Sequence, residues 1–129
     1  MKTNIINTNS APAPIGPYNQ AVWAGDMLFV SGQIALIPGT DQLNNSTIEK
    51  EGEQVMENLK AILKEAGLKL KHVVKTTIFL SDMSLFSAVN EVYSGYFKGN
   101  YPARETVAAK GLPKNVNVEI SVIAMKSKH

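Results

Sequence analysis

The chain has 129 residues, of which 44% are hydrophobic and 19% are charged. This length supports one domain with a sizeable core, so we expect a single domain over residues 1–129. The net charge of +2 is too small to predict a nucleic-acid or membrane partner, and no basic patch is evident in the sequence.

The sequence argues against metal and nucleotide chemistry. It has no cysteine, which excludes disulfides, thiolate metal sites and cysteine nucleophiles. His72 and His129 are far apart, so a metal site would depend on scattered carboxylates, and we expect none. No phosphate-binding glycine pattern and no Ser-His-Asp set is evident. No apolar run has the length of a signal peptide or membrane span, so we expect a soluble cytoplasmic protein.

The N-terminal part predicts strands. Residues Thr3 to Ile6 indicate a short one. The segments Ala21 to Ala24 and Met27 to Ile34 predict two more, and the Gly25-Asp26 dipeptide between them is typical of a two-residue hairpin turn.

Residues Thr47 to Ala66 carry the clearest helical pattern, with apolar residues recurring every three or four positions. Ser46 and Glu49 have the spacing of a capping box, and Gly67 stands where a helix ends. Gly52 lies on the apolar stripe, so we expect it to allow a close approach to a sheet.

The C-terminal part adds a strand, a helix and two strands. Residues His72 to Leu80 are dense in β-branched side chains, and Asp82 can cap a helix over Met83 to Phe97. Two further strands are expected at Arg104 to Ala109 and at Val116 to Met125. The order ββαβαββ predicts an α+β fold, in which a mixed sheet has both helices packed on one face.

The other face of this sheet is expected to be apolar as well. Strand alternation places Phe29, Val107 and Ile123 there. Too little chain remains to cover these residues, so we expect an oligomer to do so.

Arg104 is the only arginine of the sequence, and Glu119 lies in mid-strand between apolar neighbours. If the last two strands form a hairpin around Gly111 and Leu112, these two residues come within a residue or two of each other. A cross-strand ion pair is one interpretation. The other is a small-molecule site, in which the arginine binds an anion through two hydrogen bonds and the glutamate transfers protons. The pattern alone does not choose between them.

Three more positions are candidates. The Gly16-Pro17 turn aims Tyr18, which either packs at a loop or faces a ligand. Gly32 interrupts a strand beside Ser31, which indicates either a bulge or a close backbone approach. Asn90 lies among apolar residues of the second helix, where it either bonds a loop or contacts a ligand.

The motifs that contain these residues resemble, in order and spacing, those of the RidA (YjgF) family of reactive-intermediate, or imine, deaminases. The resemblance extends from about Ile15 to Ala124 and rests on "IGPYNQAV", "FVSGQI", "ENLKAILKEAG", "VVKTTIFLSDM", "VNEVYSGYF", "YPAR", "LP" and "VEISVIA". It implies a chorismate-mutase-like homotrimer with sites between subunits. The implied reaction is hydrolysis of 2-imino acids to 2-keto acids and ammonia, without cofactor or metal.

The resemblance also implies roles for individual residues. Arg104 would bind the substrate carboxylate, while Glu119 and Tyr18 would complete the catalytic set. The implied substrate-binding residues are Ser31, Gly32, Asn90 and Thr106.

The chain departs from the family pattern at three positions. Many relatives have serine at the positions of Asn19 and Glu105, and many have proline at that of Ala35. Strand alternation sends Glu105 to the face opposite Arg104, so we expect catalysis to survive and substrate preference to be affected.

Two rivals to the deaminase remain open. The first is a trimer that binds 2-keto acids without turnover. The second is an RNA-acting translation inhibitor, against which the near-neutral charge counts.

Overall fold

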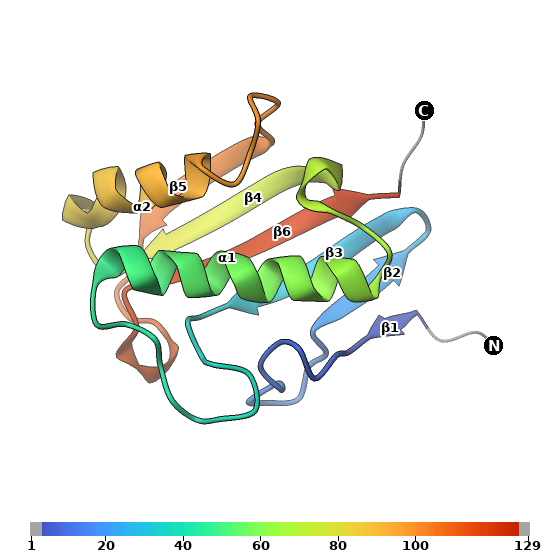
Figure 1. Ribbon diagram of the computed structural model, residues 1–129, viewed down its shortest axis with the longest axis horizontal. Helices are drawn as coiled ribbons and strands as arrows, with labels where there is room; N and C mark the ends of the chain where they lie inside the picture. Colours follow the sequence, from blue (N-terminus) through green and yellow to red (C-terminus); the bar gives the residue numbers. More distant parts are fainter. Residues whose placement is uncertain (1–3, 127–129) are drawn as a thin grey trace.

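The computed structural model describes residues 4–126, so that Thr3 and His129 of the sequence predictions lie outside it. Six strands form one sheet in the order β1-β2-β3-β6-β4-β5, and two α-helices cover one face of it (Figure 1). The strands are β1 (Ile5–Ile6), β2 (Ala21–Ala24), β3 (Met27–Gln33), β4 (Val73–Leu80), β5 (Ala103–Ala108) and β6 (Val118–Met125). The helices are α1 (Ile48–Glu65) and α2 (Phe86–Ser94), with short 3-10 turns at Leu70–His72, Met83–Leu85 and Pro113–Asn115.

The sheet is mixed. Strands β4 and β5 are parallel, joined by a crossover that contains α2, whereas the other neighbouring strands are antiparallel. Strand β6 enters between β3 and β4, so the last two strands of the chain do not form a hairpin. The expected α+β class, with both helices on one face, is confirmed.

The hydrophobic core lies between the sheet and α1. Alternate residues of β6 point into it and are buried: Val118, Ile120, Val122 and Ala124. Helix α1 contributes a stripe of fully buried side chains, namely Val55, Leu59, Ile62 and Leu63. Burying each side chain of this size contributes about 1.5–3 kcal/mol, so the stripe fixes the position of α1 on the sheet.

Helix α1 begins one residue later than a capping box at Ser46 and Glu49 requires, so that prediction is wrong. The N-cap is Thr47, whose hydroxyl accepts a hydrogen bond from the Lys50 N–H at 3.0 Å. The other end agrees with the sequence, because Gly67 adopts a φ of 80° just after the last turn.

Gly52 permits a close approach, but to α2 and not to the sheet. A Cβ at this position would lie 3.3 Å from Cγ1 of Val92 on α2. The expectation of a helix–sheet contact is therefore wrong, and the glycine brings the two helices together.

Helix α2 is shorter than the predicted span of Met83 to Phe97. Asp82 caps a 3-10 turn through the Ser84 N–H at 2.8 Å, and α2 itself begins only at Phe86. After Ser94 the chain continues in tight turns, since the Tyr96 N–H bonds the Tyr93 carbonyl three residues back at 3.1 Å.

The sheet face away from the helices is open and carries exposed apolar side chains, as expected. Phe29 is 45% exposed and Val107 is 47% exposed, and Ile123 lies beside Phe29 in the β3–β6 register. In the described part of the chain, no helix is long and apolar enough to cross a membrane.

Candidate functional site

Arg104 lies at the edge of the sheet on the face that carries the helices. The parallel pairing of β5 with β4 sets Arg104 beside the buried Thr76. The guanidinium carbon lies 5.1 Å from the ring centre of Tyr93 and 5.6 Å from that of Phe86, both on α2. These are cation–π distances, so the two rings of α2 hold the guanidinium in place. No ion pair with a described residue occupies it.

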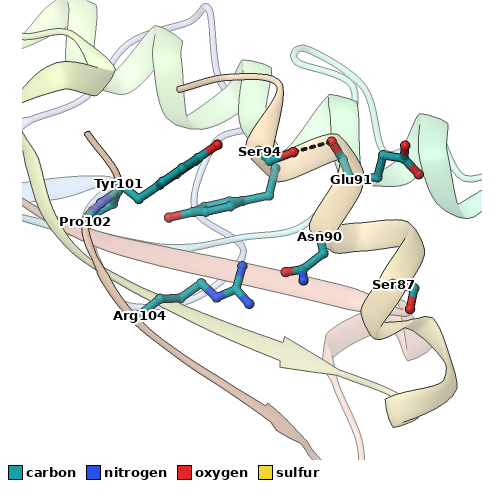
Figure 2. A pocket seen from close by; sticks show the side chains of 8 residues that line it. Ser87, Asn90, Glu91, Ser94, Tyr101, Pro102 and Arg104 are labelled. Atoms are coloured by element: carbon teal, nitrogen blue, oxygen red, sulfur yellow. Dashed lines mark hydrogen bonds between the residues drawn. The ribbon is translucent and has the colours of Figure 1, made fainter. Parts of the chain in front are cut away.

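The arginine opens into a pocket of about 650 Å³ between β5 and α2. Figure 2 shows its side chain extending below Tyr101 and pointing toward the amide of Asn90. Within residues 4–126 no carboxylate forms an ion pair with Arg104. The rest of the wall comes from Ser87, Glu91, Tyr93, Ser94 and Pro102.

Tyr93 joins the arginine to the sheet. Its hydroxyl donates a hydrogen bond to the Thr76 hydroxyl at 2.9 Å. Burial raises the pKa of Tyr93, while the bond to Thr76 and the charge of Arg104 act in the opposite direction. The phenol is therefore neutral at physiological pH, and its ring faces the guanidinium in a fixed position.

Two further predicted site residues lie with Arg104. Asn90 lines the same pocket, and no hydrogen bond between described residues occupies its side chain. Thr106 follows two positions along β5, and its hydroxyl oxygen is buried without a hydrogen-bond partner among residues 4–126. Both side chains have unused hydrogen-bonding capacity. We call Arg104, Asn90 and Thr106 the arginine half-site.

Glu119 lies on the opposite face of the sheet. It pairs in register with Phe79 of β4, while its neighbours Val118 and Ile120 point into the core. On its other side, the β3–β6 register shifts between Val30 and Gln33, which is where Gly32 stands.

The side chain of Glu119 lies against the backbone of Gly32. A Cβ on this glycine would lie 2.9 Å from the carboxyl carbon of Glu119. Both interpretations of Gly32 thus hold, because it stands at an irregularity of the strand and also admits a close approach. Burial raises the pKa of Glu119. No cation forms an ion pair with this carboxylate within the described residues.

Ser31 and Tyr18 lie near Gly32. The Ser31 hydroxyl donates to the Asn19 carbonyl at 2.6 Å, so this hydrogen bond joins β3 to the loop before β2. The Tyr18 hydroxyl accepts from the Ile15 N–H at 3.2 Å, and the ring is 44% exposed. Tyr18 and Gly32 line a recess of only about 20 Å³, too small to hold a ligand without another surface. We call Glu119, Gly32, Ser31 and Tyr18 the glutamate half-site.

One residue that the sequence analysis missed fixes the loop before Tyr18. Gln20 is 1% exposed. Its side-chain oxygen accepts from the Thr8 N–H at 2.6 Å, and its nitrogen donates to the Pro12 carbonyl at 2.7 Å. Nothing in the local pattern distinguishes this glutamine from a surface one.

The two half-sites do not meet within one chain. Strand β4 lies between β5 and β6, so Arg104 and Glu119 are about 10 Å apart across the sheet and a similar distance along it, and they face opposite ways. The prediction that they are near neighbours is wrong, and so is the cross-strand ion pair. The prediction for Glu105 is confirmed: it points away from Arg104 and pairs with Lys75 at 3.4 Å.

The chemistry available in the half-sites is anion binding and proton transfer. Arginine supplies a two-pronged donor, and a carboxylate with a raised pKa can accept and return a proton. Within residues 4–126 there is no group of three or more His, Asp or Glu side chains that could hold a metal ion.

A second, larger groove lies away from both half-sites. It has a volume of about 1090 Å³ at the C-terminal ends of α1 and α2, and its walls include Tyr96 and Phe97. No basic patch is expected from the sequence, but five lysines gather here: Lys60, Lys64, Lys69, Lys71 and Lys98. Lysines near helix C-termini offset the negative end of the helix dipole, which accounts for part of this cluster.

The family model described as Endoribonuclease L-PSP matches residues 8–126. A relative from Arabidopsis thaliana, named "Reactive Intermediate Deaminase A, chloroplastic", is 43% identical over 124 residues, covering 96% of this chain and 66% of that protein.

Solved structures agree with the fold. A crystal structure from Thermotoga maritima matches with a TM-score of 0.94 at 52% identity, covering 99% of this chain and 100% of the other. The structure of E. coli TdcF with bound serine matches with a TM-score of 0.91 at 40% identity, covering 95% of this chain and 98% of that one. The mixed sheet with two helices is thus the chorismate-mutase-like fold.

Proposed function

The chain belongs to the Endoribonuclease L-PSP family, to which the YjgF and RidA proteins belong, and on that premise we propose that it is a hydrolase of reactive 2-imino acids and their enamines. The products are 2-keto acids and ammonia, and the substrates are small, as in 2-aminoacrylate and 2-iminobutyrate. The deaminase name of the Arabidopsis relative supports this class of reaction.

In the proposed mechanism Arg104 binds the substrate carboxylate. Its guanidinium is held by the rings of Phe86 and Tyr93, and no acidic residue of the described chain forms an ion pair with it. Asn90 lines the same pocket and adds a hydrogen-bonding amide beside the bound carboxylate, while Thr106 follows two positions along β5 with its hydroxyl buried.

Glu119 supplies the proton transfers. Its carboxylate takes a proton from water as the water oxygen bonds to C2 of the imine, which gives a tetrahedral carbinolamine. The same proton then passes to the nitrogen, which gives the neutral carbinolamine. Glu119 next moves the proton of the C2 hydroxyl to the amino group, so that the C–N bond breaks, ammonia leaves and the C2 carbonyl forms. Gly32 and Ser31 orient the substrate, and Tyr18 closes the cleft. General acid–base help of about 10²- to 10⁴-fold suffices, because imines also hydrolyse in water.

We propose that the site is shared between subunits of a homotrimer. The single observation that carries this proposal is the geometry of the two half-sites, which face apart within one chain although each lacks what the other holds. A head-to-tail ring of subunits would place the arginine half-site of one copy against the glutamate half-site of the next. The open apolar sheet face with Phe29 and Val107 supports such an assembly.

The test is clearance of 2-iminobutyrate and 2-aminoacrylate, generated in place by an amino-acid oxidase or a dehydratase. We expect the wild type to accelerate imine loss, and Arg104→Ala and Glu119→Gln each to abolish that acceleration. Co-expressed Arg104→Ala and Glu119→Gln chains, mixed equally, should regain about a quarter of wild-type activity, because that share of sites draws both intact residues from different chains. No recovery in the mixed protein would contradict the shared site.

A binding protein that uses the same cleft without turnover is the first alternative. The TdcF structure with bound serine supports this alternative, because serine carries a carboxylate of the kind that Arg104 would bind. Glu119 distinguishes the two, since carboxylate binding does not need it. Retained 2-ketobutyrate binding in a wild type that does not accelerate imine loss would establish the binding protein.

An RNA-binding role is the second alternative, and the five-lysine groove is the observation that favours it. Its walls combine positive charge with aromatic rings, as in proteins that bind single strands. The test is RNA binding at several salt concentrations. A steep decrease in affinity with salt, lost when Lys64 and Lys69 are replaced by glutamate, would support this role.

We propose the cytoplasm as the compartment and residues 1–129 as one functional domain. The Arabidopsis relative is named as chloroplastic, so the same fold also serves in an organelle.

A further inference from the structure

The most unusual charged residue outside the half-sites is Glu51. It stands in the first turn of α1 and is 0% exposed. Its carboxylate has no cationic partner within residues 4–126 and is held by hydrogen bonds alone. Burying a carboxylate costs free energy unless its oxygens accept hydrogen bonds. The groups that donate to Glu51 therefore indicate its role.

All three donors to Glu51 come from the two residues that precede Glu119. The Asn117 N–H donates to Oε2 at 2.8 Å, and the Asn117 side-chain nitrogen donates to Oε1 at 3.0 Å. The Val118 N–H donates to Oε2 at 3.3 Å. The position near the positive end of α1 also favours the negative charge.

The Glu51 carboxylate accepts hydrogen bonds at the start of β6, where no strand of the described chain lies on the β3 side. Strand β3 pairs with β6 as far as Ile120, opposite Gln33, so the start of β6 has β4 on one side only. On the β4 side, Asn117 is held by Ser81, whose N–H donates to its carbonyl at 2.9 Å and whose hydroxyl donates to its side-chain oxygen at 3.0 Å. Glu51 supplies the acceptors on the open side.

We propose that Glu51 is a positioning residue, which sets the backbone of Asn117 and Val118 and through it the orientation of the Glu119 carboxylate. The inference rests on the proposed function, in which Glu119 transfers the proton. The Glu119 side chain makes no hydrogen bond to another described residue, so its place depends on its own backbone and on contact with Gly32. The irregularity of β3 that makes room for Glu119 also removes its strand partner, and α1 compensates for this.

The first experiment is Glu51→Gln, which keeps the shape of the side chain but turns one acceptor into an amide donor facing an N–H group. We expect kcat for imine hydrolysis to decrease about 10- to 100-fold, the effect of a displaced catalytic group. The KM and the affinity for 2-ketobutyrate should stay within about twofold, because Arg104 lies across the sheet and is not displaced.

Two controls separate positioning from general destabilisation. Glu53→Gln makes the same chemical change two residues along α1, at an exposed position. Ile62→Val weakens the core beneath the same helix, at a fully buried residue. Both should keep wild-type kcat. An equal decrease in kcat for Ile62→Val, or a KM that rises with the decrease in kcat for Glu51→Gln, would overturn the proposal.

A readout without turnover makes the two proposals distinguishable. In carbon-detected NMR, the Glu119 carboxyl of Glu51→Gln should titrate closer to the ordinary value than in the wild type, because the freed side chain reaches water. The Asn117 amide should also exchange faster. If the wild type hydrolyses no imine, the proposed function fails, while these spectra still decide the positioning role. An unchanged Glu119 titration would overturn it.

Ser81→Ala is the alternative test of the positioning role if Glu51→Gln does not fold. It loosens Asn117 from the β4 side and leaves the Glu51 carboxylate paired. A lower kcat at unchanged KM would support the proposal, and an unchanged kcat would contradict it.

Discussion

The carboxylate of Glu119 fills the space that a side chain at Gly32 would need. The contact joins two residues 87 positions apart (119 − 32) on neighbouring strands. The contact restrains the orientation of the Glu119 side chain within the glutamate half-site.

Gly32→Ala tests this contact. A Cβ would meet the far end of the Glu119 side chain, which can rotate away, so the stability should decrease by only about 1 kcal/mol. The displaced carboxylate should nevertheless lower kcat by about 10-fold or more. Urea unfolding and imine clearance measure the two effects. Gly111→Ala is the matched control, because nothing lies within 4 Å of a Cβ there. A Gly32→Ala protein with full activity would show that Glu119 does not act from this position.

Arg104→Lys should fail in the same assay. Lysine keeps the charge but loses the two-pronged geometry and the stacking on Tyr93, so kcat/KM should decrease about 10- to 100-fold. Stability should change little, because no ion pair with a described residue is lost. Calorimetric binding of 2-ketobutyrate should weaken in parallel. As the control, Glu105→Ser changes a residue on the other face and should retain activity. Full activity of Arg104→Lys would contradict the two-pronged binding of the carboxylate.

Glu119 should make stability depend on pH. Burial raises its pKa above the ordinary value of 4.5, so the folded state binds the proton more tightly than the unfolded state does. Stability from this group is full below 4.5 and is lost as the pH rises through the folded pKa. Glu119→Gln should therefore raise the thermal midpoint at neutral pH, and this gain should vanish as the pH approaches 4.5. A gain that instead grows toward acid would mean that the pKa of Glu119 is lowered.

The cap of α1 offers a stability test with a built-in control. Thr47→Ala removes the hydroxyl that accepts from Lys50, so it should cost about 1 kcal/mol. Ser46→Ala makes the same chemical change one residue earlier and should cost almost nothing, since Ser46 does not cap the helix. Urea unfolding of the two variants decides. Equal effects would restore the capping box that the sequence suggested.

Local patterns were sufficient to predict most elements. The strands and helices fall close to their expected ranges, because hydrophobic periodicity reports which face of an element is buried. Gly67 ended α1 as expected, since its φ of 80° suits glycine. The start of α1 after Thr47 and the end of α2 at Ser94 were harder to predict, because the end turns of a helix depend on a few hydrogen bonds.

Strand order could not be read from the same patterns. A local period does not say which strand lies beside which, so β5 and β6 were expected to pair although β4 separates them. That one error moved Arg104 next to Glu119. The predicted site residues lie in two groups and not one.

Contacts between distant segments were also beyond the sequence. Phe86 and Tyr93 looked like core residues, and their seven-residue spacing on one helix face was the only sign that both could stack on Arg104. Glu51 resembled its surface neighbours Glu49 and Glu53, because nothing local reveals that it is buried.

The opposed directions of Arg104 and Glu119 have a consequence for the protein in dilute solution. Under the proposed shared site, a lone subunit holds both residues and yet has no working centre. Activity per chain would then fall on dilution, in step with dissociation of the ring, and would return on concentration. Protein abundance itself would thereby act as a threshold below which the reactive substrate is left to decay in water.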